Sequence, residues 1–116
     1  MISTGTVLTH HLECFDKGDL EGLLSDYTED TVLETGTGRI TGLQPLRKIF
    51  SSLLKEFGRG KSSFVILRHS ISDNHAFIIW KAETEDNVYH VGSDTFYILD
   101  GKIVYQTFAG YITPRS

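Results

Sequence analysis

Hydrophobic residues recur at helical spacing in the first half of the chain and alternate with polar residues in the second half. The helical spacing predicts three helices, over residues 4–16, from the Asp19 cap to Leu24, and over residues 43–57. Short apolar pieces between the second and third helices predict two brief strands, at residues 31–35 and 39–41.

The second half of the chain has the period of two that is typical of strands. Four long strands are predicted, at residues 63–72, 75–84, 88–99 and 102–113. Asp100-Gly101 is a strong hairpin signal between the last two. Helices followed by hairpin-connected strands indicate an α+β domain, with the helices covering one face of a curved antiparallel sheet. No linker or repeat interrupts residues 1–116, so we expect a single domain.

Composition narrows the class of protein without naming a function. Of the 116 residues, 40% are hydrophobic and 22% are charged, which is typical of a globular domain. The net charge of −4, with acids and bases interspersed, argues against a nucleic-acid partner. No apolar run approaches the ~20 residues of a membrane helix, and the first residues lack the layout of a signal peptide. With Cys14 as the lone cysteine, we expect a cytoplasmic protein.

Asp94 is a carboxylate on a face that otherwise belongs in a core. Alternation along the strand places four side chains on that face: His90, Asp94, Phe96 and Ile98. A carboxylate in the interior must be paired, hydrogen-bonded, or held partly neutral by a raised pKa. Asp94 is therefore the first candidate for chemistry in this chain.

The interior faces of the neighbouring strands supply an apolar surrounding for Asp94. The even positions from Ala76 to Ala82 include Trp80, and the face of the last strand includes Gln106 and Phe108. His11 from the first helix and Tyr27 are expected to close the sides of this cavity. The residues predicted to line a small-molecule pocket are Tyr27, Trp80, His90, Phe96, Gln106 and Phe108.

Each candidate also has a structural interpretation. Asp94 can be a general acid/base, or it can bond a buried amide, a hydroxyl or His90. His11 can be its catalytic partner or a satisfied core histidine. Tyr27 and Trp80 can be ligand-stacking walls or core residues with satisfied polar tips. The histidines show no metal-binding spacing, and we expect neither a metal nor a cofactor.

Five short motifs are spread over the chain: FDKGDLEGL at residues 15–23, YTEDTV at residues 27–32, Gly42 before a helix, DTF at residues 94–96 and DGKI at residues 100–103. Together they resemble the nuclear transport factor 2-like superfamily, and within it the SnoaL-like group of polyketide cyclases and ketosteroid isomerase relatives. The resemblance covers nearly the whole chain. It implies a cystatin-like cone, in which a strongly curved sheet wraps around a long helix and leaves a pocket at the open end.

The resemblance also implies roles for individual residues. Asp94 falls where ketosteroid isomerases have a buried, protonated aspartate that helps hold an enolate oxygen. His11 falls where those enzymes have the tyrosine of the same oxyanion hole. Thr35 falls where they have the aspartate base, and a threonine cannot serve as that base. Glu34 is one residue away, on the opposite face unless a bulge re-aims it.

These observations lead to one favoured function and one alternative. The favoured function is cofactor-independent acid/base chemistry on a small apolar carbonyl compound, as an isomerase, cyclase, dehydratase or hydrolase. Asp94 and His11 are the expected catalytic residues. The alternative is a non-catalytic module that binds a ligand or forms a dimer. Aromatic and aliphatic residues on the outer face of the sheet predict a homodimer, namely Phe77, Ile79, Tyr97, Tyr105 and Tyr111.

Overall fold

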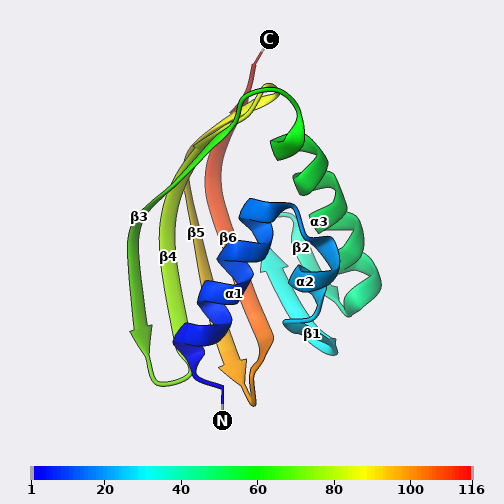
Figure 1. Cartoon of the computed structure of the whole chain (residues 1–116), viewed down its shortest axis with the longest axis vertical. Helices are drawn as coiled ribbons and strands as arrows, with labels where there is room; N and C mark the ends of the chain where they lie inside the picture. The colour runs from blue at the N-terminus through cyan, green and yellow to red at the C-terminus, as the bar shows by residue number, and fades with distance from the viewer. Residues whose placement is uncertain (1, 116) are drawn as a thin grey trace.

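Three helices and six strands make up the computed structural model, which describes residues 2–115 (Figure 1). In chain order they are α1 (Thr4–Lys17), α2 (Leu20–Leu24), β1 (Tyr27–Thr35), β2 (Gly38–Thr41), α3 (Leu43–Gly58), β3 (Ser63–Ser72), β4 (His75–Glu83), β5 (Asn87–Leu99) and β6 (Lys102–Pro114). The α+β class and every predicted helix and strand are confirmed. The largest difference in boundary is at β1, which begins four residues before the predicted residue 31.

The six strands form one curved sheet in the order β2-β1-β6-β5-β4-β3. Strands β3 to β6 are an antiparallel meander, as predicted. The sheet departs from a purely antiparallel one at a single neighbouring pair, because β1 runs parallel to β6, with Leu33 opposite Gln106. Hydrophobic alternation reports which face of a strand is buried and not which strand lies beside it, so the pattern could not predict this pairing.

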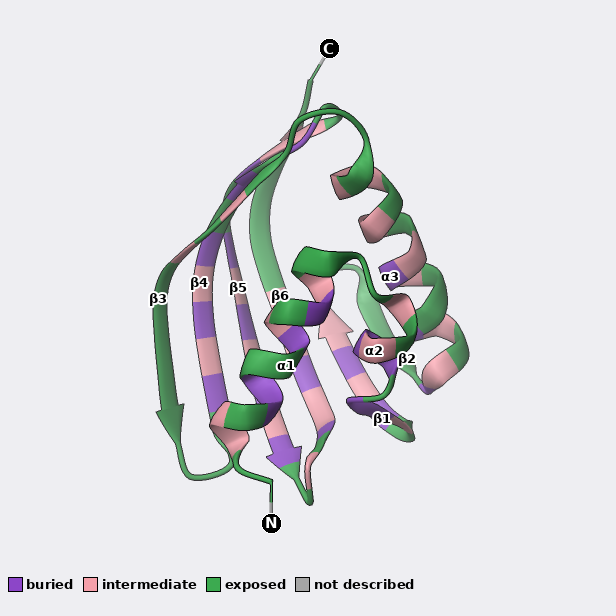
Figure 2. Ribbon diagram, in the orientation of Figure 1, coloured by how far each residue is buried: buried purple, intermediate pink, exposed green. Residues whose placement is uncertain are grey.

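The three helices cover the concave face of the sheet, as Figure 1 shows. α1 lies across the middle of this face, and α3 stands beside β1 and β2. The buried residues follow this layering, since they lie on the inner stripe of α1 and on alternate residues of β4 and β5 (Figure 2). Leu23, Phe96 and Ile103 are among the most deeply buried side chains. Within residues 2–115, none of the helices has the length and apolar character needed to cross a membrane.

A bulge in β5 changes which of its residues face inward. Tyr89 pairs with Ile112 and Val91 with Tyr111, so β5 has one residue more than β6 at this point. The extra residue, His90, breaks the alternation. Tyr89 is consequently buried and His90 is exposed, whereas Asp94 keeps the predicted inward direction. The prediction that His90 shares the interior face with Asp94 is therefore wrong.

Polar contacts hold α1 at both ends and in its middle. The Ser3 side chain accepts a hydrogen bond from the Thr6 amide at the N-terminus, and Gly18 ends the helix with a φ of 71°. In the middle, Nδ1 of His10 lies 2.8 Å from the carboxylate of Asp26, in the turn before β1. These contacts fix the helix that carries His11 across the sheet.

Glu56 connects the C-terminal part of α3 to the β4–β5 hairpin. Its carboxylate accepts hydrogen bonds from the Thr84 hydroxyl at 2.6 Å, the Asn87 amide at 2.9 Å and the Tyr89 hydroxyl at 2.9 Å. Partial burial acts to raise the pKa of Glu56, but the hydrogen bonds from Asn87, Thr84 and Tyr89 outweigh it and leave this pKa below its ordinary value. The ionised carboxylate therefore stabilises the contact between α3 and the far end of the sheet.

Replacing Glu56 by alanine should lower the free energy of unfolding by about 1–3 kcal/mol, because three donors lose their acceptor. The contribution of Glu56 should be present above its ordinary pKa and should disappear as the pH falls through its lower folded-state pKa. Urea denaturation of the wild type and Glu56→Ala at several pH values measures both effects. Lys55→Ala, at the exposed neighbouring position on α3, is the control. Equal stability of Glu56→Ala and the control at neutral pH would contradict this role.

Candidate functional site

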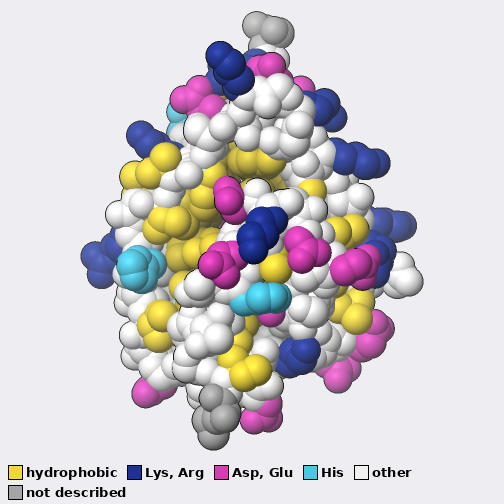
Figure 3. All heavy atoms as spheres, in the orientation of Figure 1, with side chains coloured by type: hydrophobic (Ala, Val, Ile, Leu, Met, Phe, Trp, Pro, Cys, Tyr) yellow, Lys and Arg dark blue, Asp and Glu magenta, His cyan; other side chains and the backbone are white. Residues whose placement is uncertain are grey.

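A pocket of about 540 Å³ opens between α1, α3 and the concave face of the sheet. Its volume lies in the range of small-molecule sites. The lining is mostly apolar and aromatic, and in the space-filling view hydrophobic side chains gather in a hollow above and beside α1, over the sheet (Figure 3). The lining side chains of the sheet include Phe64, Ile78, Trp80, Tyr89, Asp94, Phe96, Gln106, Phe108 and Ile112.

Four buried polar side chains from four strands form one chain of hydrogen bonds in the wall of this pocket. Nε1 of Trp80 donates to Oδ1 of Asp94 at 2.8 Å, and Nε2 of Gln106 donates to Oδ2 of Asp94 at 2.8 Å. The Tyr27 hydroxyl in turn donates to Oε1 of Gln106 at 2.5 Å. These hydrogen bonds place the Asp94 carboxyl between β4 and β6, and both of its oxygens have a donor.

Gly92 makes room for the Trp80 end of this chain of hydrogen bonds. It lies opposite Trp80 across the β4–β5 pair, and a Cβ at this position would come within 2.5 Å of the indole ring. The indole therefore lies over the backbone of β5. From there its Nε1 reaches the Asp94 carboxyl on the same strand. Gly92 was not among the predicted site residues, although a glycine inside a strand is a recognised sign of close approach.

Burial raises the pKa of Asp94 above its ordinary value, and the hydrogen bonds from Trp80 and Gln106 offset this rise only in part. The two donors lower the pKa of Asp94, in opposition to burial, because they hydrogen-bond to the charged form and so stabilise it. A carboxyl group has roughly four acceptor positions, and two of them are occupied in Asp94. The remaining positions can hold a proton or receive one from a ligand.

His11 borders the same pocket from α1 but makes no hydrogen bond to Asp94 within the described part of the chain. Its ring packs edge-on against Phe96, Tyr27 and Phe50, at centroid distances of 5.3, 5.9 and 6.0 Å. Burial, with a smaller contribution from the nearby His10, lowers the pKa of His11 to about 4. The imidazole is therefore neutral near pH 7, and its buried Nδ1 has no hydrogen-bond partner among residues 2–115.

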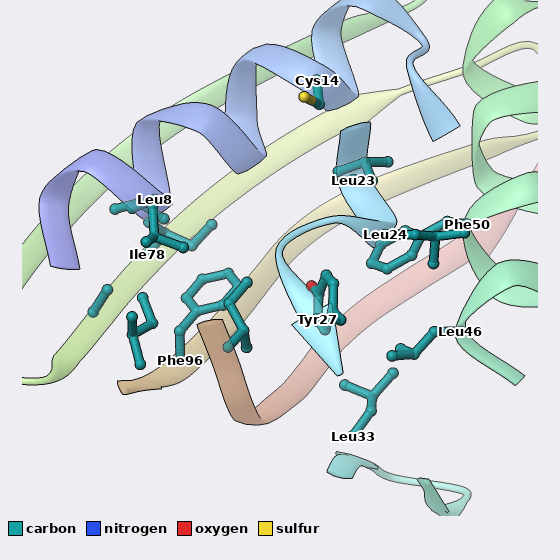
Figure 4. Packing of buried hydrophobic residues seen from close by; sticks show 14 of the residues in the cluster. Leu8, Cys14, Leu23, Leu24, Tyr27, Leu33, Leu46, Phe50, Ile78 and Phe96 are labelled. Carbon is teal, nitrogen blue, oxygen red and sulfur yellow. The ribbon is translucent and has the colours of Figure 1, made fainter. Parts of the chain in front are cut away.

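The structure brings most of the predicted site residues together. His11, Trp80, Asp94, Phe96, Gln106 and Phe108 all line the pocket. Tyr27 lies behind the wall, where it supports Gln106 (the close-up in Figure 4 shows it beneath α2 at the start of β1). His90 lies outside, stacked on Tyr111 at a centroid distance of 4.8 Å and bonded to the Thr113 hydroxyl.

Glu34 does not complete the site. Its carboxylate pairs with the Arg39 guanidinium at 2.8 Å and receives a hydrogen bond from Tyr105, and the pair is largely exposed. The hydrogen bond from Arg39 holds the pKa of Glu34 below its ordinary value. Its neighbours Leu33 and Thr35 line the pocket instead, as alternation along β1 requires. No bulge re-aims Glu34 toward Asp94.

The α3 wall of the pocket was missed by the sequence analysis. Leu53 and Phe57 are half-buried side chains on the inner face of α3, with Lys48 and Ser52 at its exposed edge. The apolar stripe of residues 43–57 predicted an inward face. Only the structure shows that part of this stripe faces an open pocket rather than packed side chains.

Solved structures with the same arrangement define the class of fold as nuclear transport factor 2-like. The chain aligns with the epoxide hydrolase/cyclase-like enzyme SalBIII of pyran ring formation in polyether salinomycin (TM-score 0.81, 15% identity, 97% of this chain and 95% of that chain). It also aligns with an NTF2-like protein of unknown function from Mesorhizobium loti (TM-score 0.77, 18% identity, 93% and 90%) and an LEH-like epoxide hydrolase from M. tuberculosis (TM-score 0.71, 15% identity, 90% and 80%). At these identities the similarity establishes the fold alone.

The family follows from the sequence itself. The family model for the SnoaL-like domain matches residues 8–106, which is most of the chain. The chain therefore belongs to the SnoaL-like domain family, as its motifs indicated. A comparison with curated proteins gave no match.

The wild-type Asp94 carboxyl should titrate above its ordinary pKa, and Trp80→Phe should raise this pKa further, because the substitution removes a donor that favours the charged form. Carbon-13 NMR of the labelled carboxyl measures both values. Phe108→Leu changes the apolar lining and keeps both donors, so it serves as the matched control. An Asp94 pKa at or below the ordinary aspartate value in the wild type would show that burial does not dominate at this site.

Proposed function

We propose that the protein is a cofactor-independent acid/base catalyst that acts on a small apolar carbonyl compound bound in the pocket. The observation that carries this proposal is the Asp94 carboxyl, which is 8% exposed and sits in the wall of an apolar cavity with two donors holding it in place. A carboxyl group whose pKa is raised toward neutrality can take up and return a proton more readily than an exposed aspartate.

Asp94 would move the proton, and its surroundings would hold it in position. In its ionised form it accepts a proton from the carbon next to the ligand carbonyl, and it returns that proton at a second position to give an isomer. Trp80 and Gln106 stabilise the ionised state by donating to both oxygens. His11, which is neutral, can donate a hydrogen bond to the carbonyl oxygen while negative charge develops there. The apolar lining excludes competing water.

The relatives support this type of chemistry without naming the reaction. Two structures with the same fold carry names of hydrolases or of a cyclase-like enzyme. Cofactor-independent isomerase, cyclase, dehydratase and hydrolase reactions all need a positioned group that moves a proton. A single buried carboxyl beside a neutral imidazole is compatible with each of them.

The alternative function is ligand binding without turnover. It is favoured by one observation, which is that Tyr27, Gln106, Asp94 and Trp80 satisfy one another while His11 is packed among aromatic rings. Such a network can have a purely structural role, which is to stabilise a hollow interior. The two functions differ in whether Asp94 exchanges protons with a bound ketone.

Asp94→Asn should abolish proton exchange and leave binding intact. The Gln106 side-chain amide can rotate to donate toward Tyr27 and accept from the new Asn, so the chain of hydrogen bonds can re-form. With 2-tetralone as the probe, deuterium exchange at the carbons next to the carbonyl, followed by proton NMR, should fall by about 100-fold or more. Binding is followed by the NMR signal of the Trp80 indole N–H, which is unique because the chain has one tryptophan.

Asp100→Asn, in the exposed β5–β6 turn, is the matched control and should exchange at the wild-type rate. Undiminished exchange by Asp94→Asn would refute the catalytic role of Asp94. Binding of 2-tetralone without any acceleration of exchange by the wild type would favour the binding module.

We further propose that two copies of the chain pair through the outer face of the sheet. Tyr111 is 61% exposed and Val91 is 41% exposed on this face. Tyr97 and Tyr105 lie opposite each other there on β5 and β6 and are half-buried in the single chain. Apolar and aromatic area of this kind usually marks an interface.

Light scattering should therefore report a dimer at micromolar concentration, and Tyr111→Arg should shift it toward the monomer because a charge would be buried between the two sheets. Gln44→Arg adds the same charge at an exposed position of α3 and should leave the dimer unchanged. A monomeric wild type would count against this pairing.

A further inference from the structure

Two residues with formally charged side chains line the pocket, and they lie on opposite walls. Asp94 is on β5 and is buried, whereas Lys48 is on α3 and is exposed. Ile49 and Leu53, on the same helix, are half-buried pocket residues. The positive charge therefore lies at the solvent edge of the cavity, and the carboxyl lies inside it.

The Lys48 ammonium group is not neutralised by a carboxylate of the described chain. The four arginine–carboxylate ion pairs within residues 2–115 involve Arg39, Arg47, Arg59 and Arg115. Lys48 takes part in none of them. The residues three and four positions away on α3, which are its helix-surface neighbours, are Gln44, Pro45, Ser51 and Ser52. None of these is acidic.

Ser52 adds a hydroxyl group one helical turn beyond Lys48, on the same edge of the pocket. An ammonium and a hydroxyl side by side offer donors to an anionic group. The interior of the pocket holds no cationic side chain for a permanent anion, because its Trp80 and Gln106 donors already serve the Asp94 carboxyl and the His11 imidazole is neutral. A second anion there would also face both a carboxylate and apolar walls.

We propose that the ligand of this pocket is an apolar molecule with one anionic group, which Lys48 and Ser52 hold at the mouth while the apolar body enters toward Asp94. This inference rests on the proposed function, since it assigns the ligand class and the ligand's direction in the same pocket. The direction places the end of the ligand that is remote from the anionic group next to Asp94. Lys48 is thus a specificity-determining residue and takes no part in the proton transfer.

Two probes of similar size, 2-naphthoate and 2-naphthalenemethanol, distinguish the contribution of the charge to the binding affinity from that of the apolar body. Isothermal titration calorimetry should show that the wild type binds 2-naphthoate about two- to fivefold more tightly, as expected for one partly exposed ion pair. Lys48→Gln should abolish this preference and Lys48→Glu should reverse it, with little change for the alcohol. Lys55→Gln, an exposed lysine on α3 outside the pocket lining, should keep the wild-type preference. Added salt should weaken the preference of the wild type.

The two proposals can fail separately in this experiment. If the wild type binds both probes equally and Lys48→Gln changes neither affinity, the anionic ligand class is refuted while the apolar pocket stands. If the preference is lost equally in Lys55→Gln, the general positive charge of α3 causes it, and the role of Lys48 is refuted. If neither probe binds to the wild type, the pocket function itself fails.

Discussion

The hydrogen bonds to the Asp94 carboxyl are the constraint on which the rest of the pocket depends. An ionisable group of this kind is costly to bury, and the cost is met by donors on the two neighbouring strands, Trp80 and Gln106. Each donor brings its own requirement. The Trp80 ring needs the space that is left because Gly92 has no side chain. The Gln106 side chain is held by the hydroxyl of Tyr27 on β1. The parallel pairing of β1 with β6 is what brings Tyr27 within reach.

The hollow beside this network is a second constraint, because an open pocket leaves apolar side chains without packing partners. α3 forms one wall of the hollow, where Leu53 and Phe57 on its inner face are only half-buried. The C-terminal part of α3 is therefore fixed by polar contacts. There Glu56 accepts hydrogen bonds from Thr84, Asn87 and Tyr89 of the β4–β5 hairpin. At the other side, His10 and Asp26 fix α1. Hydrogen bonds at the edges of the pocket thus replace part of the packing that a filled core would provide.

Much of the fold, and the part of the pocket wall around Asp94, could be predicted from the sequence. Alternation placed Trp80, Asp94, Phe96 and Gln106 inside, and the SnoaL-like motifs gave the class of fold. His90 was misplaced because a one-residue bulge leaves no mark in the hydrophobic pattern. The α3 wall was missed because a stripe facing a cavity looks like one facing a core. Hydrogen bonds between strands far apart in sequence, such as Tyr27 to Gln106, depend on strand order, which the pattern does not contain.

The function of the pocket requires that the Asp94 carboxyl face a bound ligand. A crystal structure of the protein soaked with 2-tetralone would show whether it does. We expect the ring system to lie against Phe96, Phe108 and the inner face of α3, with the carbonyl end toward Asp94 and His11. We also expect the hydrogen bonds from Trp80 and Gln106 to Asp94 to persist. A ligand bound elsewhere, or a pocket that has closed so that Asp94 contacts only protein, would contradict this function of the pocket.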